Sequence, residues 1–157
     1  MVKRILIYGM TNLKGGVESY IMNIYRNLDY NEIIFDYICD FPEMAYHEEV
    51  IKNGSKIYFI PSKRKNLFFH LWNIFKILKK HREYEVVYFN ILNASAAISM
   101  LPVKLLGRKI ISHSHNSSDI NMKIHNKFKW LLNKLSDEKL ACSYEAGKYM
   151  YLNKDRY

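Results

Sequence analysis

The sequence has few cysteines, and the two that it has stand far apart. Cys39 and Cys142 both lie in apolar stretches, and neither belongs to a CxxC or Cys/His pattern. This excludes a disulfide-stapled fold and a zinc site of the usual ligand spacing. With only three prolines and six glycines, the chain is not collagen-like either. We predict that both cysteines are buried and act as small hydrophobic side chains.

Long hydrophobic runs are also missing. No segment reaches the roughly 18 uninterrupted apolar residues that a transmembrane helix needs, because Lys, Asn or His interrupts the longest candidates. The first apolar segment, residues 5–8, follows a basic pair but is too short for a signal-peptide core, and no small-residue cleavage site follows it. These features predict a cytoplasmic protein with reduced thiols.

Acidic residues are scarce relative to basic ones. The chain has 15 Asp and Glu residues against 24 Lys and Arg residues, which gives a net charge of +9. An excess of this kind favours anionic partners, such as phosphate-bearing small molecules, an acidic membrane surface or nucleic acid. We do not expect nucleic acid, because no helix-turn-helix, RNP or zinc motif accompanies the charge.

Short β-branched segments alternate with longer helical segments along the 157 residues. This alternation predicts a single α/β domain with a Rossmann-like, doubly wound parallel sheet and helices on both faces. The expected strands are residues 4–8, 33–39, 56–60, 85–89, 109–113 and 139–142. The expected helices are residues 16–28, 42–52, 66–81, 94–106, 123–135 and 144–151, and Pro102 is expected to interrupt the fourth.

The loop after the first expected strand carries two adjacent glycines, Gly15 and Gly16, where the helix begins. Ligands of doubly wound sheets bind at the carboxyl ends of the strands. Glycines there let a ligand approach the backbone, and the helix N–H groups face an anion. The loop is therefore either a phosphate-binding turn or a flexible turn with a good helix entry. It lacks the GxGxxG and P-loop patterns, which disfavours a nicotinamide-dependent enzyme, although Asp40 stands where a ribose ligand is expected.

Polar residues crowd the end of the fifth expected strand, residues 112–118. His113 and His115 are candidates for a general base or for a neutral donor to a sugar or phosphate oxygen. We do not expect a metal site, because further ligands are missing and the two side chains are expected to point in opposite directions. The alternative is a polar strand end that caps the next helix.

A basic, aromatic segment extends over residues 63–82. Its apolar positions form one helical stripe, with Phe69 and Trp72 beside the stripe and basic residues at both ends. The stripe consists of Leu67, Leu71, Ile74, Phe75 and Leu78. The segment is expected either to cover the sheet or to lie on an anionic bilayer.

Three motifs together resemble a known family. They are Gly15-Gly16-Val17-Glu18, His113-Ser114-His115-Asn116 and the segment ACSYEAG at residues 141–147. In order and spacing they resemble the N-terminal half of bacterial glycosyltransferases of the GT-B fold. The most similar group is the family 4 retaining enzymes that build capsular polysaccharides and exopolysaccharides.

The resemblance implies a role for the first two motifs. Residues 1–157 are expected to form the acceptor-side Rossmann-like domain, half of a GT-B fold. Gly15 and Gly16 are expected to contact the diphosphate of the donor sugar nucleotide. His115 is expected near the transferred sugar as the catalytic histidine, with His113 as the second choice.

The resemblance also implies further cleft residues and no metal. Glu18, Asn116 and Ser143 are expected to line the cleft, although Ser143 could equally cap a helix. In this fold a helix dipole and basic side chains neutralise the donor phosphates. We therefore expect no metal or other cofactor, and a nucleotide-diphosphate sugar as co-substrate.

The sequence departs from the family at its end. The chain ends at Tyr157, and the C-terminal domain that holds most of the donor in the family has no counterpart in it. One half of a cleft cannot exclude water from the reaction. We therefore expect a fragment, a truncated product or one subunit of a split enzyme, with catalysis dependent on the missing domain or a partner subunit.

Two hypotheses follow from the sequence. In the first, the protein helps to transfer a hexose from a nucleotide-diphosphate sugar to a saccharide or lipid-linked acceptor in cell-surface polysaccharide biosynthesis. It would then act in the cytoplasm, at the anionic inner face of the membrane. In the second, the chain is a non-catalytic Rossmann-like module that binds a membrane or a partner.

Overall fold

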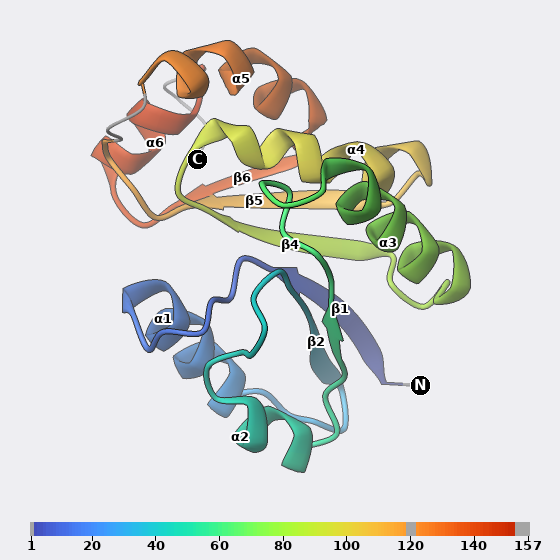
Figure 1. The fold of residues 1–157 in the computed structure, drawn as a ribbon. Helices are drawn as coiled ribbons and strands as arrows, with labels where there is room; N and C mark the ends of the chain where they lie inside the picture. Colours follow the sequence, from blue (N-terminus) through green and yellow to red (C-terminus); the bar gives the residue numbers. More distant parts are fainter. Residues whose placement is uncertain (1, 119–121, 153–157) are drawn as a thin grey trace.

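The centre of the molecule is a six-stranded sheet whose neighbouring strands are all parallel (Figure 1). The computed structural model describes residues 2–118 and 122–152. The strands lie in the order β3-β2-β1-β4-β5-β6. Their bounds are Lys3–Tyr8 (β1), Ile33–Cys39 (β2), Ile57–Phe59 (β3), Val86–Ile91 (β4), Lys109–Ser114 (β5) and Glu138–Ala141 (β6).

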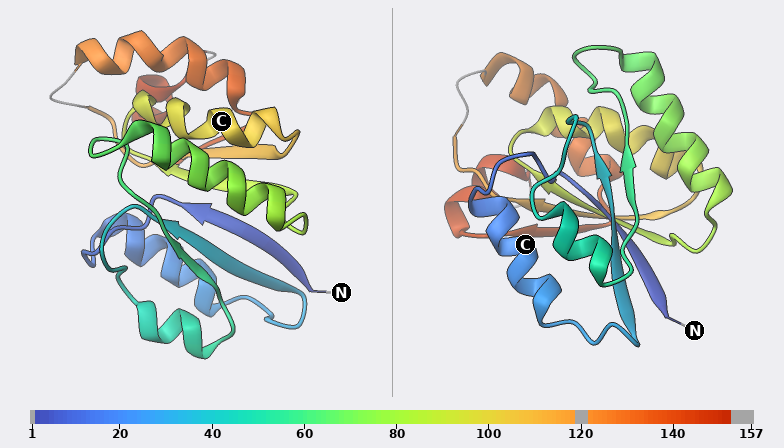
Figure 2. Two further views of the ribbon diagram at one scale, coloured as in Figure 1. Left: turned by 45° about the vertical axis from the view of Figure 1, so that its right-hand side comes forward. Right: turned by 60° about the horizontal axis from the view of Figure 1, so that its bottom comes forward.

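Helices cover both faces of the sheet, two on one face and three on the other (Figure 2). α1 and α2 lie over β1 and β2, whereas α3, α4 and α5 lie on the opposite face and α6 follows β6. Their bounds are Gly16–Arg26 (α1), His47–Lys52 (α2), Leu67–Lys80 (α3), Ala97–Leu105 (α4), Met122–Leu135 (α5) and Tyr144–Met150 (α6), with a 3-10 helix η1 at Ala94–Ala96. The predicted doubly wound α/β fold is confirmed.

Two hydrophobic cores hold the layers together. The larger core lies under α3, α4 and α5 and includes Leu6, Phe89 and Ile110. The smaller core lies under α1 and α2 and includes Ile7 and Tyr37. Leu6 and Ile7 enter different cores because successive side chains of a strand point to opposite faces. Burial on both faces explains why β1 reads as a continuous apolar run.

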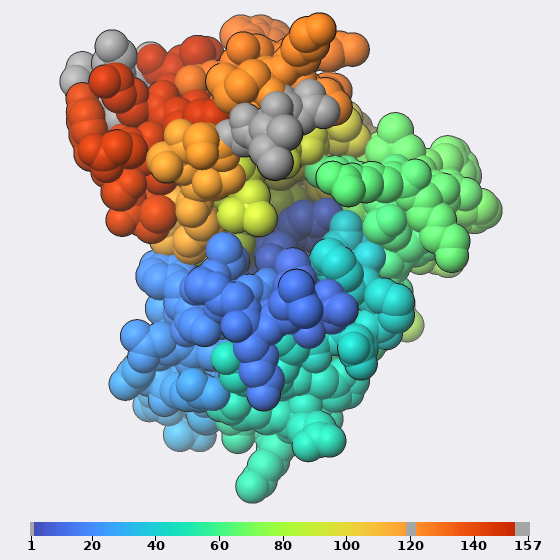
Figure 3. Space-filling view, turned by 60° about the vertical axis from the view of Figure 1, so that its left-hand side comes forward, coloured from blue at the N-terminus to red at the C-terminus, as the bar shows by residue number. Residues whose placement is uncertain are grey.

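The strand order reverses between β1 and β4, which are neighbours in the sheet although β2 and β3 separate them in the sequence. Such a switch point opens a crevice at the carboxyl ends of the strands. A groove of about 510 Å³ lies there, and Figure 3 shows the molecule hollowed between the loops that follow β1, β2 and β4. The topology therefore places a ligand-sized groove at the edge that the sequence predicted.

Two helix starts differ from the prediction. The helix expected over residues 42–52 begins at His47, because Tyr46 has a left-handed φ of 61° that an α-helix does not accommodate. The helix expected over residues 94–106 begins as η1 and continues as α4. Pro102 lies inside α4 and does not end it, because the buried proline ring packs into the helix's core-facing side.

The prediction for one cysteine is also wrong. Cys39 is buried, but Cys142 is exposed. Cys142 directly follows β6, which is an edge strand with a neighbour on one side only. The apolar character of a strand end at the sheet edge therefore does not indicate burial.

A buried carboxylate, Asp36 on β2, joins four strands. Asp36 is 0% exposed and accepts hydrogen bonds from Arg4 Nε and Nη2 at 2.6 and 2.7 Å. It also accepts from the Lys56 backbone N–H before β3 and from the Tyr84 hydroxyl before β4, both at 2.6 Å. A buried charge is tolerated only when it is paired and hydrogen-bonded in this way.

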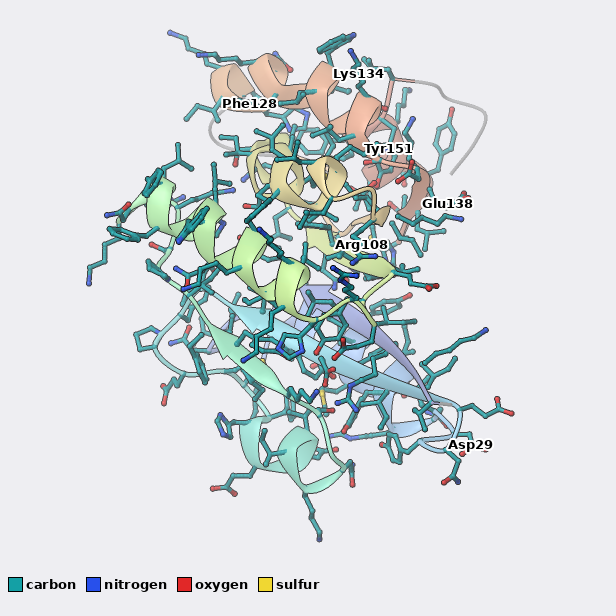
Figure 4. All side chains as sticks on the ribbon, turned by 90° about the vertical axis from the view of Figure 1, so that its right-hand side faces the viewer. Asp29, Arg108, Phe128, Lys134, Glu138 and Tyr151 are labelled. Atoms are coloured by element: carbon teal, nitrogen blue, oxygen red, sulfur yellow. The ribbon has the colours of Figure 1, made fainter. Side chains whose placement is uncertain are left out.

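We expect Asp36→Ala to lower the free energy of unfolding by about 3–5 kcal/mol, because it leaves the Arg4 charge and two buried donors without their acceptor. Urea unfolding of the purified chain measures this change. Glu138→Ala is the matched control, since its ion pair with Lys109 is exposed on both sides (Figure 4). We expect the control to change stability by less than about 0.5 kcal/mol. Equal effects of the two substitutions would contradict a structural role for Asp36.

Candidate functional site

The loop between β1 and α1 is held by one buried carboxylate, Glu18 in the first turn of the helix. Glu18 is 4% exposed. Its Oε1 accepts hydrogen bonds from the Thr11 N–H at 3.0 Å and the Thr11 hydroxyl at 2.7 Å, and its Oε2 accepts from the Gly15 N–H at 3.2 Å. These bonds fold the loop back onto the helix start, as in a capping box. The loop therefore has a defined shape in the absence of ligand.

Gly15 and Gly16 lie at the N-terminus of α1, as the sequence predicted. Gly15 is the N-cap residue, and a Cβ there would lie 2.9 Å from Oε2 of Glu18. A Cβ at Gly16 would meet nothing within 4 Å. The backbone at Gly16 is therefore open to an approaching group, and the first N–H groups of α1 have no intrahelical acceptor.

His113 and His115 lie side by side at the end of β5. Their ring centroids are 4.1 Å apart, and the Tyr20 ring of α1 stands edge-on to both at 5.0 and 5.2 Å. The prediction that the two histidines point in opposite directions is wrong. Residues two apart on a strand share one face, and the intervening Ser114 points to the other.

Each histidine has a partner on the neighbouring strand β4. His113 Nδ1 lies 2.6 Å from the Tyr88 hydroxyl, and His115 Nε2 lies 2.9 Å from Oδ1 of Asn90. Burial lowers the pKa of His113 to about 4, and the neighbouring His115 acts in the same direction. Burial also lowers the pKa of His115, although the Glu18 carboxylate opposes this change. Both rings are therefore neutral at pH 7.

Ser143 and Asn116 lie outside this histidine cluster. The Ser143 hydroxyl accepts a hydrogen bond from the Ala146 N–H at 3.1 Å and so caps α6, which is the structural alternative that the sequence left open. Asn116 is half-buried, and its carbonyl accepts from the Ser114 hydroxyl at 3.4 Å. A role for either residue in ligand binding stays a prediction.

The groove at the carboxyl edge has polar residues that sequence reasoning largely missed. Tyr8, Asp40, Lys63, Asn90 and Asn93 contribute to its lining. The Tyr8 hydroxyl donates to Asp40 Oδ2 at 3.3 Å, and burial lowers the pKa of Lys63 while the Asp40 charge opposes this. A signal was available, because several of these residues come just after strands that share one edge.

Two searches of the described part of the chain gave negative results. Residues 2–118 and 122–152 contain no group of three or more His, Cys, Asp or Glu side chains placed to hold a metal ion. Among the same residues, every helix is too short or too polar to cross a bilayer.

The low pKa of His113 predicts a pH-dependent stability. In the unfolded chain a histidine binds a proton near pH 6.5, whereas folded His113 does so only near pH 4. Unfolding therefore takes up a proton between these values, and the free energy of unfolding falls as the pH is lowered. We expect His113→Phe to reduce the slope of that free energy against pH by up to about 1.4 kcal/mol per pH unit, measured by urea unfolding between pH 4.5 and 6. Equal slopes would contradict a buried neutral His113.

Comparison with known proteins identifies relatives of this chain. The model of the family described as Glycosyltransferase Family 4 matches residues 14–150. The chain is 27% identical over 160 residues to EpsF of Bacillus subtilis (strain 168), which is provisionally named a glycosyltransferase. The match covers 95% of this chain but 41% of EpsF, so the chain spans about two fifths of that relative's length.

Solved structures with little sequence identity share the fold. MurG of Acinetobacter baumannii matches 90% of this chain with a TM-score of 0.62 at 14% identity, and 41% of its own chain is covered. A UDP-GlcNAc 2-epimerase of Neisseria meningitidis, bound to UDP-GlcNAc, matches 98% with a TM-score of 0.65 at 8% identity, and 44% of it is covered. At these identities the likeness is one of fold.

The family match, the relative and the fold agree with one another. The matched residues 14–150 include the glycine loop, the histidine pair and the capped start of α6. The fold is that of the N-terminal domain of a GT-B glycosyltransferase. The chain belongs to Glycosyltransferase Family 4.

Proposed function

We propose that the chain is the acceptor-side domain of an enzyme that transfers a hexose from a nucleotide-diphosphate sugar to a saccharide or lipid-linked acceptor. The observation that carries this proposal is the juxtaposition of the α1 N-terminus with the histidine pair. Tyr20 of α1 contacts both rings, and the Glu18 charge acts on His115. A phosphate site and a sugar site are thus adjacent.

The donor diphosphate is proposed to bind at Gly16. The backbone there is uncovered, and the N-terminus of a helix attracts anions through its free N–H groups and its dipole. Two structural neighbours are described with related ligands, UDP-GlcNAc in the Neisseria meningitidis epimerase and UDP in S. aureus MnaA. The latter matches all of this chain, and 43% of its own, with a TM-score of 0.65 at 10% identity.

The acceptor is proposed to bind in the groove beside this site. Asp40 and Asn93 offer hydrogen-bond acceptors for sugar hydroxyls, and Lys63 supplies a positive charge for an anionic group of the acceptor. Since the chain spans 41% of EpsF, transfer itself is proposed for the protein together with a donor-side domain or subunit. The proposed setting is cell-surface polysaccharide biosynthesis. The alternative is a non-catalytic binding module.

Titration with nucleotides tests donor binding and separates the two functions. We expect UDP, a UDP-sugar or a GDP-sugar to raise the thermal midpoint of the chain, and NAD to have no effect, in one buffer of fixed ionic strength. Gly16→Val should abolish the shift, because the new side chain fills the open space beside the helix N–H groups.

Asn23→Val is the matched control, since it places the same side chain at an exposed position of the same helix, about two turns away. It should leave the shift unchanged. No shift with any nucleotide, or an equal shift in Gly16→Val, would contradict the proposed donor site.

We also propose that the protein lies on the inner face of the membrane. Leu67, expected in the buried stripe of α3, is 45% exposed, because it is the first residue of the helix. Phe68, Phe69 and Trp72 are 70%, 50% and 46% exposed. Exposed Arg64 and Lys65 precede them, and exposed aromatic residues beside basic ones suit an anionic bilayer.

Sedimentation with vesicles tests this surface. The chain should bind vesicles of anionic phosphatidylglycerol and not of neutral phosphatidylcholine, and binding should weaken at high salt. The double variant Phe68→Ser, Phe69→Ser should lose most of the binding. Leu105→Ser, which removes a 77% exposed apolar side chain from α4, is the control and should bind normally. Equal binding by the two variants would contradict membrane docking through α3.

A further inference from the structure

Asn90, near the end of β4, connects the backbone of β1 to His115. Its side chain is buried, with 6% of the residue exposed. Its Nδ2 donates to the Tyr8 carbonyl at 3.4 Å, and its Oδ1 lies 2.9 Å from Nε2 of His115. The Tyr8 carbonyl can only accept, so the amide NH₂ must face Tyr8 and the amide oxygen must face His115. Nε2 of the neutral His115 therefore carries the ring proton.

The backbone beside Tyr8 is shaped for this contact. Gly9 has a φ of 108°, which L side chains rarely adopt. A Cβ at Gly9 would lie 2.3 Å from the Asn90 carbonyl oxygen and 3.0 Å from its Cβ. Only glycine permits this close approach of β1 to β4, so the position of Asn90 is set by the backbone and not by a rotatable side chain.

The groups around His115 leave this arrangement to Asn90. The Glu18 carboxylate acts on His115 by its charge, and Tyr20 and His113 contact its ring. Within residues 2–118 and 122–152, none of these three groups is hydrogen-bonded to the ring, and Nδ1 has no partner. Asn90 is therefore the side chain that selects the tautomer.

We propose that Asn90 is the positioning residue of the site, which fixes His115 with its proton on Nε2 and leaves Nδ1 as a hydrogen-bond acceptor. This inference rests on the proposed function for its consequence. A free Nδ1 accepts from a hydroxyl, whereas the oxygens of a donor diphosphate carry no proton to give. His115 accordingly binds a hydroxyl of the transferred sugar, and the diphosphate is left to the N–H groups of α1.

Nitrogen-15 NMR of the histidine rings in the unliganded chain tests this proposal. We expect His115 to show a protonated Nε2 and an unprotonated Nδ1 at pH 7.5. In Asn90→Leu, which removes the acceptor, both tautomers should appear. Asn93→Leu is the matched control, because the Asn93 side chain bonds Ser95 and not a histidine, and it should keep the parent tautomer. A protonated Nδ1 in the parent, or an unchanged tautomer in Asn90→Leu, would overturn the proposal.

Asn90→Asp keeps the proposal testable if the leucine variant does not fold. The carboxylate retains an acceptor for Nε2–H and adds a negative charge, so the tautomer should persist and the measured pKa of His115 should rise by about one unit or more. An unchanged pKa would overturn the proposal. The readout is independent of the proposed function, because these spectra need no ligand. If His115 has the expected tautomer but no nucleotide binds, the glycosyltransferase role fails and the positioning role of Asn90 stands.

Discussion

The buried carboxylate of Asp36 is the constraint on which the sheet depends. It accepts hydrogen bonds from groups on or next to β1, β3 and β4 while it belongs to β2. A charge in the interior must find such partners, so these strands can pair in one register only. That register aligns Asn90 of β4 with His113 of β5 and brings the end of β1 beside them. The geometry of the site is thus a consequence of the strand register.

A second buried carboxylate performs the corresponding task at the helix start. Glu18 bonds two backbone N–H groups and a hydroxyl of its own loop, which leaves the later N–H groups of α1 free for a ligand. Its charge also acts on His115. The glycine loop, the helix N-terminus and the histidine pair are therefore parts of one preorganised unit, and membership of Glycosyltransferase Family 4 gives that unit a chemical purpose.

Local patterns in the sequence predicted the fold and the edge at which the groove lies. Alternating apolar strands and helices suffice for this, because crossover handedness limits how such units can join. Contacts between strands were not readable in the same way. Asn90 gains its role only from the pairing of β4 with β5 and the close approach of Gly9, which no spacing within one segment reveals. The roles of Gly15, Gly16 and the histidines in binding stay predictions.

The central claim is that the helix start and the histidine pair form one ligand site. An amide and imidazole NMR titration of the labelled chain with UDP-sugar tests it most directly. The account predicts that the largest shifts fall together on the backbone amides of residues 15–17 and on the ring of His115, with one shared affinity. Shifts confined to other surfaces, or separate affinities for the two groups, would contradict it.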